Sequence, residues 1–99
     1  MDKLREAKKI TLATLKSFAK RNADKLFVKE ESSFDGMTDC VEQNKNPQWR
    51  KVELENAYGH TGVWLVGSSR DYFELYEDGE YIGITVYNSC GEGILAIKK

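Results

Sequence analysis

The chain has 99 residues, of which 40% are hydrophobic and 31% charged, so we expect residues 1–99 to form a single folded domain and not a disordered chain. No apolar run approaches the roughly 18–20 residues of a membrane span, and the charged start MDKLREAKKI is unlike a signal peptide, so we expect a cytoplasmic protein. The net charge is −1, but residues 1–30 carry +5 and residues 31–99 carry −6.

The first region has apolar residues at intervals of three and four, which predicts an amphipathic helix. Thr11 is a candidate N-cap that divides the region into a short helix at residues 2–9 and a main helix at residues 12–22. Lysines fill the intervals and form a basic stripe. Nucleic-acid binding by this stripe stays open as an alternative, although no second basic cluster or aromatic platform joins it in the sequence.

The middle of the chain contains several short strand candidates separated by turn residues. Residues 26–30 and 39–42 flank a turn at Asp35-Gly36, and residues 49–54 alternate weakly. Residues 55–61 are polar and predict a loop, whereas residues 63–66 form an apolar run typical of a central strand.

Residues 71–88 predict a β-hairpin that turns at Asp78-Gly79, and residues 94–98 predict a last strand. A two-residue loop at Asp78-Gly79 places Glu77 opposite Glu80 and Tyr76 opposite Tyr81. The predicted fold class is therefore α+β, with one or two N-terminal helices on one face of a four- to six-stranded antiparallel sheet.

The two faces of this hairpin differ in composition, because side chains alternate across a strand. The face that we expect to pack on the helix carries the aliphatic set Phe73, Leu75, Ile82, Ile84 and Val86. The other face carries Tyr72, Glu74, Tyr76, Tyr81, Thr85 and Tyr87. Tyrosine is enriched at interface cores, but cross-strand tyrosine pairs also stabilise sheets, and the sequence leaves both interpretations open.

The hairpin tip combines Glu77, Asp78 and Glu80. Like charges that face each other across strands are destabilising, so the predicted Glu77–Glu80 pair has no structural benefit. Our hypothesis is that this acidic tip meets a basic partner. Neutralising both glutamates is then expected to raise thermal stability and weaken partner binding.

Catalytic and metal-binding motifs are sparse. Cys90 lies in a glycine-containing turn and His60 in a polar loop thirty residues away, so a small cysteine enzyme built on this pair is an alternative reading. The two cysteines, Cys40 and Cys90, are expected to be free thiols, and no close metal-ligand spacing is present, so no metal or cofactor is expected. Arg70 follows a flexible turn, where it presents its guanidinium to an anionic group or pairs with Asp71.

Three stretches of the sequence are distinctive: residues 33–37 (SFDGM), residues 67–73 (GSSRDYF) and residues 86–91 (VYNSCG). With them, the chain from Leu12 onward resembles small uncharacterised proteins of phages, plasmids and integrated elements. Proteins of this kind are often inhibitors of host defence, anti-CRISPR proteins among them. The resemblance implies a protein that acts in the host cytoplasm by binding and blocking a larger machine.

The prediction from the sequence is a non-enzymatic inhibitor that covers a basic, nucleic-acid-binding surface of a host defence complex such as a CRISPR effector. No small-molecule substrate or membrane partner is expected, and nucleic acid is not the preferred partner. The candidate contact residues are Arg70, Tyr72, Glu74, Tyr76, Glu77, Asp78, Glu80, Tyr81 and Tyr87.

Overall fold

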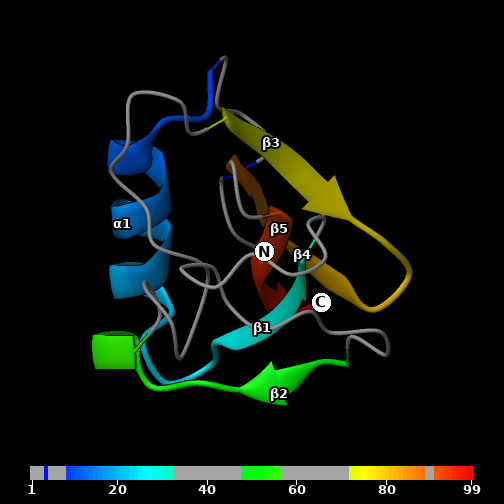
Figure 1. The fold of residues 1–99 in the computed structure, drawn as a ribbon. Helices are drawn as coiled ribbons and strands as arrows, with labels where there is room; N and C mark the ends of the chain where they lie inside the picture. The colour runs from blue at the N-terminus through cyan, green and yellow to red at the C-terminus, as the bar shows by residue number, and fades with distance from the viewer. Residues whose placement is uncertain (1–3, 5–8, 33–47, 57–71, 89–90) are drawn as a thin grey trace.

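The computed structural model describes Leu4 and residues 9–32, 48–56, 72–88 and 91–99 (Figure 1). The turn predicted at Asp35-Gly36 and the strands predicted at residues 39–42 and 63–66 lie outside the described residues, as does most of the short helix predicted at residues 2–9. The described elements are α1 (Leu12–Arg21), β1 (Phe27–Ser32), β2 (Arg50–Lys51), the 3-10 helix η2 (Leu54–Asn56), β3 (Tyr72–Glu77), β4 (Tyr81–Asn88) and β5 (Gly91–Lys98).

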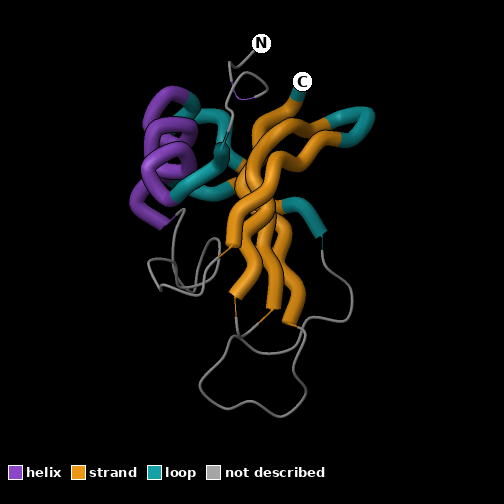
Figure 2. Tube along the Cα trace, turned by 90° about the horizontal axis from the view of Figure 1, so that it is seen from above, coloured by secondary structure: helices purple, strands orange, loops and turns teal. Residues whose placement is uncertain are grey.

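The five described strands form one sheet in the order β2-β1-β5-β4-β3, and every neighbouring pair is antiparallel. α1 runs alongside one face of this sheet (Figure 2). The predicted α+β class, with an N-terminal helix packed on an antiparallel sheet, is therefore confirmed. Within the described residues, no helix has both the length and the apolar character that a membrane crossing requires.

The helix α1 begins at Leu12, directly after the predicted N-cap Thr11. The side-chain oxygen of Thr11 accepts a hydrogen bond from the Thr14 N–H at 3.3 Å, and the Thr14 hydroxyl accepts one from the Thr11 N–H at 3.1 Å. This reciprocal pair satisfies two backbone donors at the helix start. The helix ends at Asn22, whose amide group donates to the Phe18 carbonyl at 2.9 Å.

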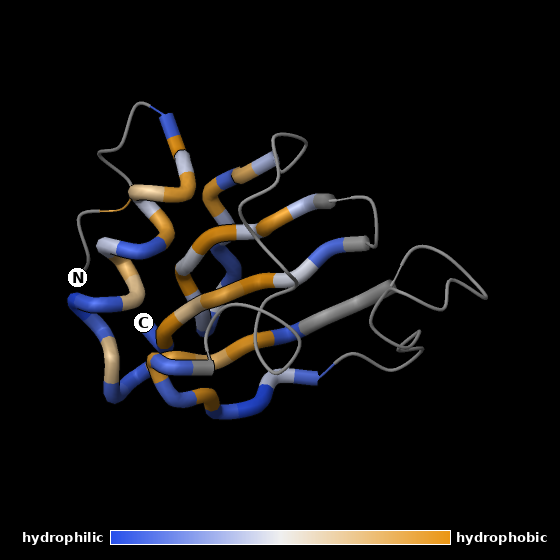
Figure 3. Tube along the Cα trace, turned by 60° about the vertical axis from the view of Figure 1, so that its left-hand side comes forward, coloured by the Kyte–Doolittle hydropathy of each residue, from blue (hydrophilic) through white to orange (hydrophobic). Residues whose placement is uncertain are grey.

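The core lies between α1 and the sheet. Leu15, Phe18 and Ala19 of α1 are fully buried against apolar residues from β1, β4 and β5. Figure 3 shows hydrophobic stretches in the middle of the strands and alternating polar and apolar stretches along α1. The strands thus bury most of one apolar face under an amphipathic helix, as the periodicity predicts. Leu75 of β3 is the exception, because it was expected on the buried face and is 41% exposed.

β4 is buried on both of its faces from Tyr81 to Val86. A side chain at Gly83 would meet β5, because a Cβ built there would lie 2.0 Å from the Leu95 carbonyl oxygen and 2.6 Å from the Ala96 Cβ. Glycine is therefore required at Gly83 by the close approach of the two backbones.

The register of the β3–β4 hairpin differs from the prediction by two residues. Tyr72 pairs with Tyr87 and Glu77 pairs with Ile82, so Glu77 does not face Glu80 and Tyr76 does not face Tyr81. The two loop residues are Gly79 and Glu80, and the Asp78 N–H donates to the Tyr81 carbonyl across the turn at 2.9 Å. Moving the loop by one residue moves the pairing by two, which leaves each side chain on its predicted face.

The other strand predictions vary in accuracy. The strand predicted at residues 26–30 is β1, and the last strand begins three residues earlier than predicted, at Gly91. The weakly alternating residues 49–54 form only the two-residue β2 and the start of η2. Pairing with β1 is limited to Phe27 with Lys51 and Val28 with Arg50, and the Val52 N–H then donates to the Leu26 carbonyl before η2 begins.

Truncating the centre of the core tests this packing. Phe18→Ala is expected to lower the free energy of unfolding by about 3–5 kcal/mol, because Phe18 is fully buried and its removal leaves a cavity. Lys16→Ala on the exposed side of the same helix is the control and is expected to change stability by less than about 0.5 kcal/mol. Urea unfolding measures both, and equal effects would contradict the described packing.

Candidate functional site

Tyr72, Glu74 and Tyr87 form a strip at the β3 edge of the sheet face that points away from α1, here called the tyrosine–glutamate strip. The Tyr72 and Tyr87 rings face each other in register, with centroids 5.8 Å apart. The Tyr72 hydroxyl donates to Glu74 Oε1 at 3.2 Å, and the Tyr87 hydroxyl donates to Glu74 Oε2 at 3.4 Å. Each carboxylate oxygen of Glu74 therefore has a phenol partner and keeps room for a further donor.

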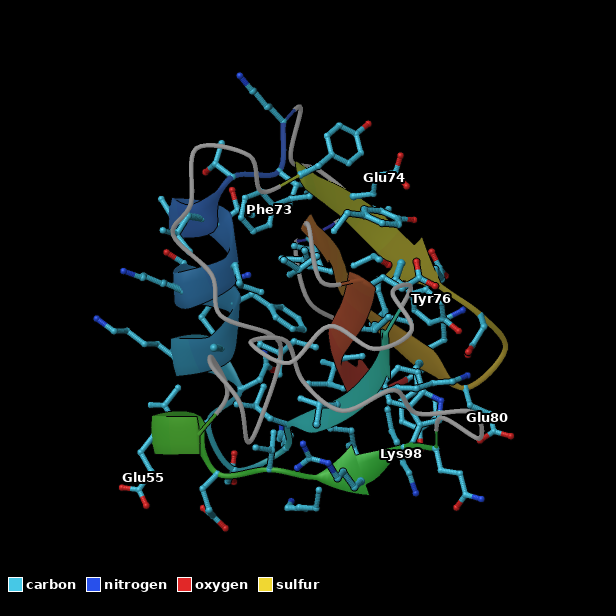
Figure 4. All side chains as sticks on the ribbon, in the orientation of Figure 1. Glu55, Phe73, Glu74, Tyr76, Glu80 and Lys98 are labelled. Carbon is cyan, nitrogen blue, oxygen red and sulfur yellow. The ribbon has the colours of Figure 1, made fainter. Side chains whose placement is uncertain are left out.

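The strip is an accessible and negatively charged surface. Tyr72 is 57% exposed, and Glu74 is exposed beside it (Figure 4). The hydrogen bond to Glu74 and its negative charge raise the pKa of Tyr72. Burial and then the charges of Glu74 and Glu92 raise the pKa of Tyr87. Both phenols are therefore neutral donors at physiological pH, and the negative charge of the strip comes from the Glu74 carboxylate.

Asp78 organises the hairpin turn. Its Oδ1 accepts hydrogen bonds from the backbone N–H groups of Glu80 and Tyr81, both at 2.7 Å, and its Oδ2 accepts one from the Tyr76 hydroxyl at 2.5 Å. These bonds, that of Tyr76 foremost, hold the pKa of Asp78 below its ordinary value. Both oxygens of the Asp78 carboxylate therefore already accept hydrogen bonds from within the hairpin.

The acidic tip has a structural explanation that its sequence does not show. Glu77 forms an ion pair with the Lys99 ammonium at 2.6 Å, and it lies beside Ile82 instead of Glu80. The expectation that neutralising both glutamates raises stability is therefore wrong for Glu77, because the assumed like-charge pair is absent. Glu80 is exposed, and its side chain has no hydrogen bond or ion pair with any other described residue.

A second group of side chains on the same sheet face is the aromatic cluster of Phe27, Trp49, Tyr76 and Tyr81. Trp49 stacks on Tyr81 with centroids 4.1 Å apart, and it also contacts Tyr76 at 5.9 Å. The Phe27 ring meets Tyr81 edge-on at 5.6 Å. Tyr81 is only 7% exposed, so this predicted contact residue is covered mainly by its aromatic neighbours.

Three lysines surround the aromatic cluster. The Lys29 ammonium lies 5.6 Å from the Trp49 ring centroid, and those of Lys51 and Lys98 lie 5.6 and 5.4 Å from the Phe27 centroid. The sequence analysis missed this group, because its members come from β1, β5 and the segment around β2. The sequence did offer one signal for this group: Phe27 and Lys29 are two residues apart in β1, which places both side chains on one face of the strand.

The structure brings Tyr72, Glu74 and Tyr87 into one surface and Tyr76, Glu77, Asp78, Glu80 and Tyr81 to the turn end of the hairpin. Arg70 lies outside the described residues, and so do Cys40, His60 and Cys90. The predicted roles of these four residues stay predictions. No group of three or more potential metal ligands occurs in the described part of the chain.

Comparisons with protein-family models, with curated proteins and with solved structures found no match. The resemblance to proteins of mobile elements therefore stays a prediction from the sequence.

The Tyr76–Asp78 hydrogen bond predicts a distinctive alkaline titration. This bond, with a smaller contribution from burial, raises the pKa of Tyr76 to about 12, above its ordinary value near 10. Because the folded-state pKa is the higher one, the stabilisation is complete below about pH 10 and disappears as the pH rises towards 12. Ultraviolet difference spectra and NMR of the tyrosine rings measure this titration.

Asp78→Asn is the informative variant, because its amide oxygen still accepts from the turn N–H groups while the negative charge is gone. The pKa of Tyr76 is expected to move back towards 10 in this variant. Glu74→Gln is the control, and it should affect Tyr72 and Tyr87 instead. An unchanged Tyr76 titration in Asp78→Asn would contradict the described bond.

Proposed function

We propose that the chain is a non-enzymatic protein-binding protein that engages a basic surface of its partner through the tyrosine–glutamate strip. The observation that carries this proposal is the Glu74 carboxylate held between the Tyr72 and Tyr87 hydroxyls at an exposed position. A carboxylate that two donors already hold in place loses less conformational entropy when it binds a cation than a mobile side chain does.

Arginine suits this arrangement best among partner side chains. Its guanidinium donates two parallel hydrogen bonds to a carboxylate, and its flat face stacks on an aromatic ring. The Tyr72 and Tyr87 rings contact each other with centroids 5.8 Å apart beside the Glu74 carboxylate, and Tyr72 is 57% exposed, so its ring is accessible for stacking. Glu92 lies opposite Tyr87 on β5 and adds negative charge beside the strip.

We extend the proposal to an inhibitory role on the basis of the resemblance to proteins of mobile elements. A nucleic-acid-binding surface is rich in Lys and Arg, because it must neutralise phosphates. An acidic aromatic surface that occupies such a site would exclude the nucleic acid. The proposed target is a host defence complex, such as a CRISPR effector.

The first test measures partner capture by the strip. Tagged wild-type protein, Glu74→Gln and Tyr72→Ala are incubated with host lysate, and the captured proteins are quantified by mass spectrometry. Each variant is expected to weaken binding of the true partner about tenfold, which corresponds to about 1.4 kcal/mol. Purified CRISPR effectors are assayed in parallel for loss of DNA binding.

Glu55→Gln is the matched control, because it removes the same charge from an exposed residue on η2. Figure 4 shows Glu55 at the far corner of the molecule from Glu74. Equal capture by Glu74→Gln and wild type, or equal loss in Glu55→Gln, would refute binding through the strip.

Nucleic-acid binding is the second candidate, and the aromatic cluster with Lys29, Lys51 and Lys98 favours it. Single-stranded nucleic acids bind where bases stack on aromatic rings and lysines contact phosphates. The acidic side chains of Asp78 and Glu80 lie next to Trp49 around a cavity of about 320 Å³, and they disfavour a polyanion there. This balance makes protein binding the leading proposal.

A matched pair of variants decides this second candidate. Replacing Lys29, Lys51 and Lys98 with glutamine should abolish salt-dependent binding of single-stranded DNA if the cluster is the site. Replacing the helix residues Lys16, Lys20 and Arg21 with glutamine makes the same charge change elsewhere. Fluorescence anisotropy with a labelled oligonucleotide measures both, and equal losses would indicate non-specific attraction only.

A further inference from the structure

β3 is the terminal strand of the sheet on the side away from β2, and among the described residues no strand pairs with its far edge (Figure 1). The two large hydrophobic side chains that are exposed in the described part of the chain both belong to this strand. Tyr72 is 57% exposed and Leu75 is 41% exposed. Natural proteins usually protect such an edge, so an accessible apolar edge strand is a feature to be explained.

The hydrogen-bond pattern shows which backbone groups of β3 face outwards. Asp78 donates its N–H to Tyr81 across the hairpin, so Asp78 belongs to a hydrogen-bonded pair of the β3–β4 ladder. Such pairs alternate along an antiparallel ladder. The backbone groups of Tyr72, Glu74 and Tyr76 therefore point to β4. Those of Phe73 and Leu75 point to the edge that no described strand occupies.

A cavity lies beside the start of this edge. It has a volume of about 400 Å³ and is lined mainly by apolar surface from residues 9–12, Tyr72 and Phe73. Figure 4 shows Phe73 between β3 and the start of α1. The cavity and the outward backbone groups of Phe73 and Leu75 thus occupy neighbouring positions along one strand.

We propose that the partner protein adds an extended, lysine- or arginine-containing segment to the free edge of β3. Backbone hydrogen bonds at Phe73 and Leu75 supply affinity, and one apolar side chain of the segment enters the cavity beside Phe73. Recognition by strand addition uses backbone bonds for binding and side-chain pockets for specificity. The inference rests on the proposed function, since it states how the same basic partner is held.

The charge of β3 favours a basic segment over a second copy of this chain. Residues 72–78 contain three acidic side chains, Glu74, Glu77 and Asp78, and no basic one. Pairing this strand with its own copy would bring six acidic groups together, which opposes dimerisation. A segment with basic residues alternating with apolar ones would place its cations beside Glu74 and its apolar side chains beside Phe73 and Leu75.

The test uses a synthetic peptide of alternating lysine and valine as the probe, with a glutamate–valine peptide as its matched control. Amide hydrogen exchange of the full chain is followed by NMR. Strand addition predicts that the lysine–valine peptide slows exchange at Phe73 and Leu75 at least tenfold. Tyr72, Glu74 and Tyr76 are protected before and after, and the glutamate–valine peptide has no effect.

Two variants of Leu75 separate backbone pairing from side-chain contact. Leu75→Pro removes the outward N–H, which β4 does not use, and it should weaken peptide binding at least tenfold. Leu75→Thr removes the leucine side chain but keeps this N–H, and it should retain binding within about threefold because threonine suits an edge strand. A peptide N-methylated at alternate residues repeats the test on the wild-type protein, should Leu75→Pro fail to fold.

Equal binding by Leu75→Pro and Leu75→Thr, or by the N-methylated and plain peptides, would overturn strand addition. Protection of Phe73 and Leu75 without peptide also overturns it. If this protection grows with protein concentration, the edge pairs with a second copy of the chain. Retained partner capture by Leu75→Pro together with loss in Glu74→Gln would reject strand addition and leave the proposed function standing. Loss in neither variant would reject both.

Discussion

The Asp78 carboxylate governs the part of the structure on which the proposed site depends. By accepting the N–H groups of Glu80 and Tyr81, it closes the hairpin turn around Gly79 and Glu80. This turn sets the β3–β4 register, which places Tyr72 opposite Tyr87 and Glu74 within reach of both hydroxyls. The tyrosine–glutamate strip is thus a consequence of a turn at the other end of the same strand.

The sheet is covered unevenly, and this determines where partners have access. α1 packs over residues of β1, β4 and β5, and β4 is buried on both faces. β3 lies beyond this cover, and no described strand pairs with its far edge. It carries the exposed side chains of Tyr72 and Leu75, and part of the strip lies on its outer face. β3 therefore contributes only the partly buried Phe73 to the core and leaves the rest of its surface to a partner.

The outer face of the sheet has two electrostatic halves. Lys29, Lys51 and Lys98 surround the aromatic cluster on the β1 side, whereas Glu74 and Glu92 lie around Tyr72 and Tyr87 on the β3 side. Such a polarised face orients an approaching charged partner even when the net charge is near zero. Only Lys29 of these lysines belongs to the basic first 30 residues, so the charge separation on this surface arises from the strand order and not from the charge order along the chain.

Local patterns in the sequence determined the helix from Leu12 to its end, the hairpin strands and the separation of aliphatic from tyrosine-bearing faces, because periodicity and capping act between near neighbours. The exact turn was not determined, since Asp-Gly favours a two-residue loop but Asp78 instead serves as the acceptor before that loop. The ion pair of Glu77 with Lys99 and the covering of Tyr81 by Trp49 join residues far apart in the chain, and the place of β3 at the end of the described sheet follows from the strand order. Only the tertiary structure decided these, because strand order and the contacts across it depend on the packing of the whole sheet and not on any local pattern.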